Sequence, residues 1–507
     1  MIVPVAVVLG LAGCSLSGSP TVSTSSPSAP SGASAARAAP DPALATFYEQ
    51  TLDWQPCESG DYCAKLTVPL DYANPAGDTI ELALLKNPAP GGDSRPPLVI
   101  NPGGPGASGV DFAKNIDGSI PESVRDAFDI VGFDPRGVGE SNPLDCLTDK
   151  QTDSFLAADG DPDTQAEVQA LINEAQVLAQ GCKQAGSQLE RHISTAEVAK
   201  DMDILRAALE QPTLDYLGFS YGTLIGATYA GQFPTRVGRF VLDGAIDPQL
   251  SNTELARGQA HGFEVALTHY IANCVKGGNC PLGNTTQAAT ARLRTFLADV
   301  DAKPLPTTSG RRLTGALALS AVIYPLYQPS YGWPMLTSAL ASALEGDGSQ
   351  MLSINDLFTQ RNADGSSEGN SLDALYAVNC IDHPDRPGPD ETAALAQQWS
   401  QQDPFFGAAL AYGNLACHYW QAPATGAPAP IAAAGSPEIL VIGTEFDPAT
   451  PYPWAQSLAA QLDNGRLLTW QGGEGHTALH HGSACIDTTV EAFLIQGVVP
   501  PDGKVCT

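Results

Sequence analysis

Short apolar runs and segments of helical periodicity follow one another through the first half of the chain. Residues 97–100, 129–133 and 214–219 are mostly apolar, as strands buried in a sheet are. Residues 195–209 instead carry apolar side chains three and four positions apart, which is the spacing of an amphipathic helix. This pattern predicts a core built of both strands and helices.

The strand pattern then stops, and helical periodicity dominates a long middle segment. Strands resume at residues 436–442 and 467–470. One large domain that is interrupted by an insertion fits this order better than a row of separate domains. We therefore expect a core formed by residues 46–248 and 436–507, with a helical insertion at residues 249–435 between its two parts.

The N-terminal residues form a different kind of segment. Residues 2–11 are apolar but too few to cross a bilayer as a helix. Leu11-Ala-Gly-Cys14 follows, and residues 1–14 look like a signal peptide that ends in a bacterial lipobox, with Cys14 as the lipidated residue. An ordinary signal peptide or a buried strand is the alternative. No Lys or Arg precedes the apolar run, and a translation start upstream of Met1 would supply one.

A linker is expected between this segment and the core. Residues 15–45 consist mainly of Ser, Pro, Ala, Gly and Thr, which cannot bury enough apolar surface to offset the entropy of ordering. A lipid on Cys14 and a flexible tether would hold the folded part outside the cell, at the outer face of the membrane. We therefore expect a cell-envelope lipoprotein, either anchored or released.

Charge narrows the range of partners. The 507 residues include 25 Lys and Arg against 55 Asp and Glu, for a net charge of −30. This balance argues against nucleic acid and anionic membrane surfaces as partners, so the only membrane contact we expect is the lipid anchor. Hydrophobic residues make up 43% of the chain, enough to bury a core.

The cysteines favour an oxidising compartment. Eleven are present, and ten remain when Cys14 is set aside as the lipidation site. The simplest connectivity pairs them in chain order: Cys57 with Cys63, Cys146 with Cys182, Cys274 with Cys280, Cys380 with Cys417, and Cys485 with Cys506. Ten cysteines allow many other pairings. Zinc is the competing use, but the chain has no C-x2-C pair, and we expect no metal.

The most informative stretch surrounds Ser220. An apolar run reaches this residue, and a segment rich in Ala and other small residues follows it without a loop. Gly218-Phe-Ser220-Tyr-Gly222 is therefore interpreted as a G-x-S-x-G nucleophile elbow, in which a sharp turn from strand to helix exposes the serine hydroxyl. The alternative is an ordinary Gly/Ser turn, but the strand-to-helix setting favours the elbow.

A glycine-rich loop at residues 101–109 directly follows the apolar run at 97–100. The backbone N–H groups of such a loop can converge on one point and hold an oxyanion. A plain Pro/Gly turn is the alternative, but beside a nucleophile elbow the loop is the expected second half of an oxyanion hole. We predict the backbone N–H groups of Gly104 and Tyr221 as its donors.

Three motifs in this order resemble the prolyl aminopeptidase and tripeptidyl aminopeptidase family of serine exopeptidases: Asn101-Pro-Gly-Gly-Pro-Gly106, Asp134-Pro-Arg-Gly-Val-Gly139 and the elbow. The resemblance covers residues 47–507 and is weakest in the helical insertion. It implies an α/β-hydrolase fold with a mostly parallel central sheet, and makes the insertion a cap domain above the active site. The prolyl branch usually has His where Asn101 stands, so the tripeptidyl branch is the better match there.

The acid and the base of a catalytic triad are expected in loops after the last two strands. Asp447 lies in a loop braced by prolines and matches the motif of the family, with Glu445 as its rival. The chain order of serine, acid and histidine is that of α/β hydrolases, and differs from the order in chymotrypsin and subtilisin.

The base is predicted to be His476. It follows Gly475 in a loop directly after a strand, whereas His480 and His481, its rivals, lie further from the strand end. Ser220, Asp447 and His476 are therefore the predicted catalytic residues.

Two further residues have weaker signals. An aminopeptidase must bind a free ammonium group, and Asp382 in the cap is the candidate carboxylate; a solvated or helix-capping role is its alternative. Arg136, in the second motif, is expected to brace neighbouring loops by bidentate hydrogen bonds rather than to bind substrate.

The resemblance implies a cell-surface exopeptidase that releases N-terminal tripeptides, or single residues, from peptides or proteins. The residues alone support an ester or amide hydrolase that acts through an acyl-enzyme and needs no cofactor. A surface esterase or lipase with the same triad is the first alternative, and a non-catalytic binding lipoprotein is the second.

Overall fold

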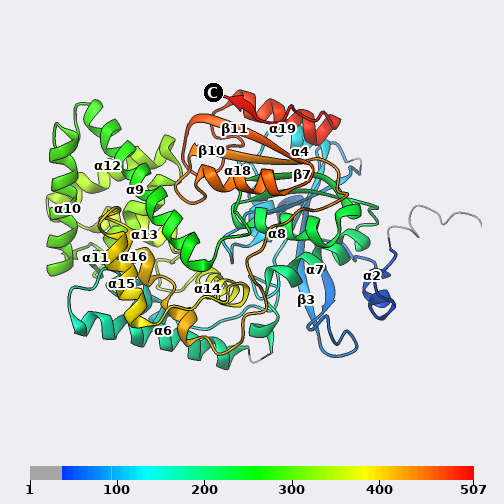
Figure 1. Cartoon of the computed structure of the whole chain (residues 1–507), viewed down its shortest axis with the longest axis horizontal. Helices are drawn as coiled ribbons and strands as arrows, with labels where there is room; N and C mark the ends of the chain where they lie inside the picture. The colour runs from blue at the N-terminus through cyan, green and yellow to red at the C-terminus, as the bar shows by residue number, and fades with distance from the viewer. Residues whose placement is uncertain (1–36, 93, 187) are drawn as a thin grey trace, which may run out of the picture.

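The computed structural model describes residues 37–92, 94–186 and 188–507 (Figure 1). The predicted signal peptide, Cys14 and most of the predicted linker lie outside the described residues. No helix in the described part of the chain is long and apolar enough to cross a membrane.

The core is a mixed sheet of ten strands in the order β1-β2-β3-β5-β4-β6-β7-β10-β11-β12. The strands are β1 (Gln55–Pro56), β2 (Tyr62–Pro69), β3 (Thr79–Asn87), β4 (Pro97–Asn101), β5 (Asp129–Phe133), β6 (Leu214–Phe219), β7 (Val237–Asp243), β10 (Ile439–Phe446), β11 (Gly465–Glu474) and β12 (Lys504–Cys506). β1, β2 and β3 are antiparallel to their neighbours, and every pair from β5 to β12 is parallel.

The central strands are buried because helices cover both faces of the sheet. In β4, Val99 packs in one apolar cluster, while Leu98 and Ile100 pack in another, since successive side chains of a strand point to opposite faces. The first cluster includes residues of α7 (Thr195–Ala208), α8 (Tyr221–Gln232) and α18 (Tyr452–Gln461). The second includes residues of α3 (Gly109–Lys114), α4 (Glu122–Ala127) and α19 (Ala484–Gln496).

A layer of helices lies beside this sheet, on the left in Figure 1. Its members between β7 and β10 are α9 (Asn252–Lys276), α10 (Thr286–Ala302), α11 (Gly315–Ile323), α12 (Pro329–Leu344), α13 (Ser349–Phe358), α14 (Ser371–Asp382), α15 (Pro389–Trp399), α16 (Gly407–Tyr412) and α17 (Leu415–Tyr419). A hairpin of β8 (Leu305–Pro306) and β9 (Arg312–Leu313) belongs to the same part of the chain. We call residues 249–435 the cap, as the sequence predicted it.

Two helices that precede β6 also contact the cap. α6 (Gln165–Ala185) packs against α14 and α17, and α5 (Asp149–Ala157) packs against α11. The remaining short helices are α2 (Ala45–Tyr48), η1 (Pro42–Leu44), η2 (Glu58–Gly60), η3 (Leu189–Arg191), η4 (Pro234–Arg236) and η5 (Tyr324–Leu326). The helical layer is thus also packed against a segment of the chain that precedes its insertion point.

Local sequence accounts for where the long cap helix begins. Ser251 caps α9 and accepts the N–H of Glu254, while the Glu254 carboxylate accepts the N–H and hydroxyl of Ser251. This reciprocal pairing satisfies N–H groups that the first turn of a helix leaves without partners. α9 then continues to Lys276.

The structure contains the five disulfides that the chain order predicts: Cys57–Cys63, Cys146–Cys182, Cys274–Cys280, Cys380–Cys417 and Cys485–Cys506. The fourth joins α14 to α17 within the cap, and the fifth joins α19 to β12 within the core. The mostly parallel sheet with helices on both faces and a helical insertion after β7 is the α/β-hydrolase fold that the sequence predicted.

Candidate active site

Ser220 lies at the turn between β6 and α8 in a strained conformation. Its φ is 55° and its ψ −125°, values that a residue with a side chain rarely adopts outside a functional turn. A Cβ atom on Gly218 would lie 2.5 Å from the carbonyl oxygen of Gly222, and one on Gly222 would lie 2.7 Å from the carbonyl oxygen of Asn101. These close contacts explain why glycine stands on both sides of the serine.

The glycine-rich loop after β4 contacts this turn directly. Gly103 and Gly104 have φ values of 97° and 107°. A Cβ on Gly103 would lie 2.8 Å from the backbone nitrogen of Tyr221 and 3.0 Å from the Cβ of Ser220. Tyr221 opens α8, so its N–H has no acceptor within the helix. The segments that carry the two predicted oxyanion donors, Gly104 and Tyr221, are therefore neighbours.

Asp447 and His476 are in hydrogen-bonding contact. The Nδ1 atom of His476 lies 2.9 and 3.0 Å from the two carboxylate oxygens of Asp447. Burial lowers the pKa of His476, but the carboxylates of Asp447 and Asp243 together raise it, and the net shift is upward from 6.5. The carboxylate thus favours the imidazolium form.

A set of donors holds the Asp447 carboxylate in place. It accepts the N–H groups of Ala449, Thr450 and Thr477 at 2.9, 2.8 and 3.1 Å, and the Thr450 hydroxyl at 3.0 Å. Thr450 was not predicted from the sequence as part of the site; its hydroxyl also lies 3.3 Å from Nδ1 of His476. A hydroxyl three residues after the predicted acid was the available signal.

Asp243, at the end of β7, links the loop of His476 to the turn of Ser220. Its carboxylate accepts the N–H groups of Ala478 and Leu479 at 2.8 to 3.1 Å. Its carbonyl oxygen accepts the N–H of Ser220 at 2.9 Å. Burial raises the pKa of Asp243 to about 6. This link was not predicted from the sequence, because Asp243 and Ala478 are 235 positions apart.

The residue after Asp243 lies beside the ring of the predicted base. A Cβ on Gly244 would lie 3.2 Å from Cε1 of His476. Within the described residues no hydrogen bond joins the Ser220 hydroxyl to the His476 ring. In free enzymes such bonds are often long and tighten only when substrate binds.

The rival acid and bases have other partners. Glu445 accepts the N–H of Gly472 at 2.6 Å. His481 lies 3.0 Å from the Gln328 amide, and burial lowers its pKa. The backbone N–H of His480 donates to Asp487 at 2.7 Å. In the part of the chain that the structure describes, none of the three side chains is bonded to Asp447.

Asp382 is held by the start of α7. Its carboxylate accepts the Thr195 N–H at 3.0 Å and also the Thr195 hydroxyl, which in turn lies 2.6 Å from the hydroxyl of Tyr221. Burial raises the pKa of Asp382. The residue is thus connected to the neighbour of Ser220, but its carboxylate serves the N-terminus of a helix. Its role in binding an ammonium group stays a prediction.

Arg136 is fully buried and braces the loops around it. Its guanidinium makes two hydrogen bonds of 2.7 Å to Asp201 and donates to the carbonyls of Pro69, Leu70 and His192 at 3.1, 3.0 and 2.8 Å. These contacts match the bracing role that the sequence favoured.

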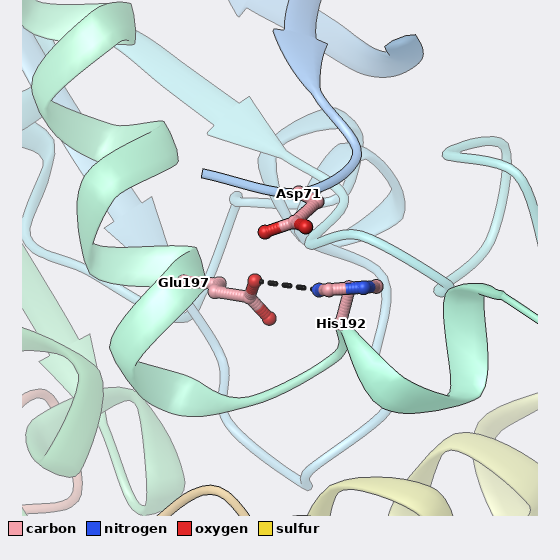
Figure 2. A group of neighbouring side chains, drawn as sticks. All are labelled: Asp71, His192 and Glu197. Carbon is pink, nitrogen blue, oxygen red and sulfur yellow. Dashed lines mark hydrogen bonds and ion pairs between the residues drawn. The ribbon is translucent and has the colours of Figure 1, made fainter. Parts of the chain in front are cut away.

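Asp71, His192 and Glu197 are the described side chains whose donor atoms come close enough to hold a metal ion, all within 4.8 Å of one another (Figure 2). Nδ1 of His192 lies 3.0 Å from Glu197, and the Arg136 guanidinium lies 3.8 Å from the same carboxylate. Asp71 accepts the N–H of Ala73 at 2.7 Å, so each of the three side chains has a partner within the protein, and the cluster enters no step of the chemistry below.

The cap also contacts the loop of His476. The carbonyl oxygen of Tyr327 accepts the His476 N–H at 2.8 Å, and His269 of α9 lies 2.8 Å from Glu474. Neither contact is visible in the sequence, because each joins residues more than a hundred positions apart.

Two protein-family descriptions match the chain: residues 96–334 match "alpha/beta hydrolase fold" and residues 403–506 match "TAP-like protein". The serine protease Hip1 of Mycobacterium tuberculosis is 37% identical over 482 residues, which span 90% of this chain and 91% of the relative. Carboxylesterase B of the same species is 36% identical, spanning 88% and 86% of the two chains. The tripeptidyl aminopeptidase of Streptomyces lividans is 28% identical, spanning 88% and 84%.

Proposed function

The chain is a serine hydrolase of the TAP-like family of α/β hydrolases, and from this premise we propose that it is an exopeptidase. It releases N-terminal tripeptides, or single residues, from peptides. The contact of Asp447 with His476, in a loop tied through Asp243 to the turn of Ser220, is the observation that carries the proposal. The similarity to a serine protease and to a tripeptidyl aminopeptidase supports the choice of peptide substrates.

In the first step His476 removes the proton from the Ser220 hydroxyl, which attacks the scissile carbonyl carbon. Asp447 holds Nδ1 of the imidazole, so that Nε2 is the atom that takes the proton. The imidazolium that forms is stabilised by the same carboxylate, consistent with the raised pKa of His476.

The tetrahedral oxyanion is held by the backbone N–H groups of Tyr221 and Gly104. His476 then gives its proton to the leaving amine, and the C–N bond breaks to leave the acyl group on Ser220. Water, deprotonated by His476, attacks the acyl-enzyme. The ester bond to Ser220 then breaks, His476 returns the proton to the Ser220 oxygen, and the N-terminal product is released. No step requires a metal or an organic cofactor.

A pair of tripeptide anilides tests the proposal. An exopeptidase that needs a free N-terminus should hydrolyse the free tripeptide anilide and reject the same compound with an acetylated N-terminus. Ser220→Ala should abolish hydrolysis, by roughly six orders of magnitude in kcat if the residues act as a unit. Equal rates on the free and the blocked anilide would contradict the exopeptidase proposal while leaving the serine hydrolase intact.

An esterase is the second candidate, because carboxylesterase B is about as similar as the serine protease. The carboxylate of Asp382, our candidate for ammonium binding, already accepts the N–H and the hydroxyl of Thr195, and an ester substrate without an amino group would not need it. Matched esters and amides with the same tripeptide acyl group separate the two functions. An esterase would hydrolyse the ester and leave the amide.

The five disulfides are consistent with an extracytoplasmic protein, since such bonds persist in oxidising compartments. We propose in addition that Cys14 carries the lipid anchor. Mass spectrometry of the N-terminal peptide from cells tests this: a lipid-modified Cys14 is expected, and an unmodified peptide that contains an uncleaved Leu11-Ala-Gly-Cys14 would contradict it.

A further inference from the structure

Aromatic side chains run outward from the predicted base across the cap. The ring of Tyr327 meets His476 edge to face, with 5.3 Å between centroids. Phe358, the last residue of α13, lies 6.0 Å from Tyr327, and Tyr324 lies 5.5 Å from Phe358. Tyr331, on α12, has the side chain of Tyr324 as its hydrogen-bond partner and so extends the row beyond Tyr324. We call these four residues, Tyr324, Tyr327, Tyr331 and Phe358, the aromatic strip.

The inner end of the strip is rigid. Tyr327 packs against the buried ring of Phe263 at 5.5 Å, and Phe263 packs against Phe406 at 5.8 Å. The Tyr327 carbonyl is bonded to the His476 N–H. The position of this ring relative to the imidazole is therefore fixed from two sides.

The outer end of the strip is open to solvent. Phe358 is 37% exposed and Tyr331 53% exposed, and Leu357 beside Phe358 is 57% exposed. The other large apolar side chains that are as exposed lie elsewhere in the described chain: Tyr62, Val498, Val499 and Val505. Contiguous exposed apolar side chains of this kind mark binding surfaces, because water is a poor solvent for them.

The chemistry of the site says which part of a substrate reaches this surface. His476 passes its proton to the leaving group, so the leaving half of the substrate lies on the side of the imidazole. The aromatic strip begins at that imidazole and extends away from it. No side chain of the strip carries a charge at neutral pH, so the surface favours an apolar ligand.

We propose that the aromatic strip binds the leaving half of the substrate, and that the enzyme prefers peptides with an aromatic or large aliphatic residue directly after the scissile bond. The inference rests on the proposed function, which it deepens by naming a substrate class. Offset and edge-to-face contacts with Phe358 and Tyr331 supply the recognition. The ring of Tyr327 makes the same kind of contact with the substrate next to the base.

The test uses peptides that share one N-terminal tripeptide and differ only in the fourth residue, which is Phe, Leu, Ala or Asp. The methyl ester of the same tripeptide, whose leaving group is too small to span the strip, reports on the catalytic groups. Chromatography of the products gives kcat/KM without a chromophore that would itself occupy the strip. We expect kcat/KM for Phe and Leu to exceed that for Ala by about tenfold.

Variants of the exposed strip residues sharpen the test. Phe358→Ala and Tyr331→Ala, singly and together, should bring the Phe-to-Ala ratio of kcat/KM toward one, and Phe358→Leu should retain part of it. Val505→Ala is the matched control, since Val505 is 53% exposed on the edge strand β12, away from the cap. It should leave the ratio unchanged.

Equal rates for Phe and Ala in the wild-type enzyme, or a preference that survives the double variant, would overturn the inference and leave the exopeptidase proposal standing. Hydrolysis of the methyl ester with no cleavage of any peptide would instead overturn the exopeptidase proposal. The strip would then be tested with 2-phenylethyl and ethyl esters, where the aromatic alcohol should be the better leaving group by a similar factor.

Discussion

The corner of the core that holds the predicted acid and base differs sharply from the cap surface that faces it. In the core corner, Asp447 has four donors besides His476, and Asp243 ties the loop of His476 to Ser220. On the cap, the ring of Phe358 packs against that of Tyr324, and both Phe358 and Tyr331 are open to water. Catalysis requires that the reacting groups be held in fixed positions, as they are in the core corner. Substrate selection requires exposed side chains that a ligand can cover, as on the cap.

The largest effect should come from breaking the contact at the centre of the corner. Asp447→Asn leaves a side chain of the same shape, but it loses the charge and stabilises the wrong imidazole tautomer. We expect kcat to fall by about 10⁴-fold. Steady-state kinetics on the free tripeptide anilide measure it, with Glu445→Gln as the control. A loss in Glu445→Gln as large as that in Asp447→Asn would show that the acid has been misassigned.

Substitution of Asp243, in the same region, should lower kcat by less than substitution of Asp447. In Asp243→Asn the amide directs its NH2 group at backbone N–H groups that need an acceptor, so the loop of His476 should shift. We expect kcat to fall on the order of 10-fold to 100-fold. Asp215→Asn is the control, because Asp215 also accepts a backbone N–H, that of Arg239, but near the opposite end of the sheet. Equal losses in both variants would reduce Asp243 to a general folding role.

The pH profile of kcat/KM should respond to a change in the core corner but not to a change on the cap surface. His476 must be neutral to act as a base, and Asp447 raises its pKa above 6.5. Activity should therefore rise with pH through a midpoint above 6.5. Weakening the ion pair in Asp447→Asn should move the midpoint to lower pH, while Phe358→Ala should leave it in place. A midpoint that does not respond to Asp447→Asn would contradict the assignment of His476.

Disulfides should show the smallest effect on chemistry. Replacing both Cys380 and Cys417 by Ser removes the link between α14 and α17, and replacing Cys485 and Cys506 removes one within the core. Each double variant should lose about 2–4 kcal/mol of stability, measured by denaturant unfolding. The cap variant should change peptide selectivity more than ester hydrolysis. An identical kinetic change in both variants would mean that the cap contributes nothing of its own to substrate choice.

Much of the fold and of the core corner was predictable from the sequence, because the signals there are local. The apolar runs predict the buried strands. The glycines around Ser220 predict a sharp turn there, and the structure shows that these positions leave no space for a Cβ. The positions of Asp447 and His476 follow from loops at strand ends, and the disulfides from cysteine order in the chain.

The rest depends on contacts between distant segments. Asp243 is hydrogen-bonded to Ala478 and Leu479, and Tyr327 is hydrogen-bonded to His476. These residues are too far apart in the chain for the spacing of apolar residues to predict the contacts. Asp382 shows that a correct position in the fold does not by itself establish a role. Its position near Tyr221 is consistent with a site residue, but only the structure shows that Thr195 occupies its carboxylate. A single sequence gives the residue type at each position, but not the distant residue with which it forms a hydrogen bond.

Labelling with a fluorophosphonate tests the central claim most directly, because the reagent reacts only with a serine that a neighbouring base has activated. The account predicts a single adduct, which peptide mapping by mass spectrometry places on Ser220, and which is lost in Ser220→Ala and strongly slowed in His476→Ala. An adduct on another serine, or a folded protein that takes no label, would contradict it.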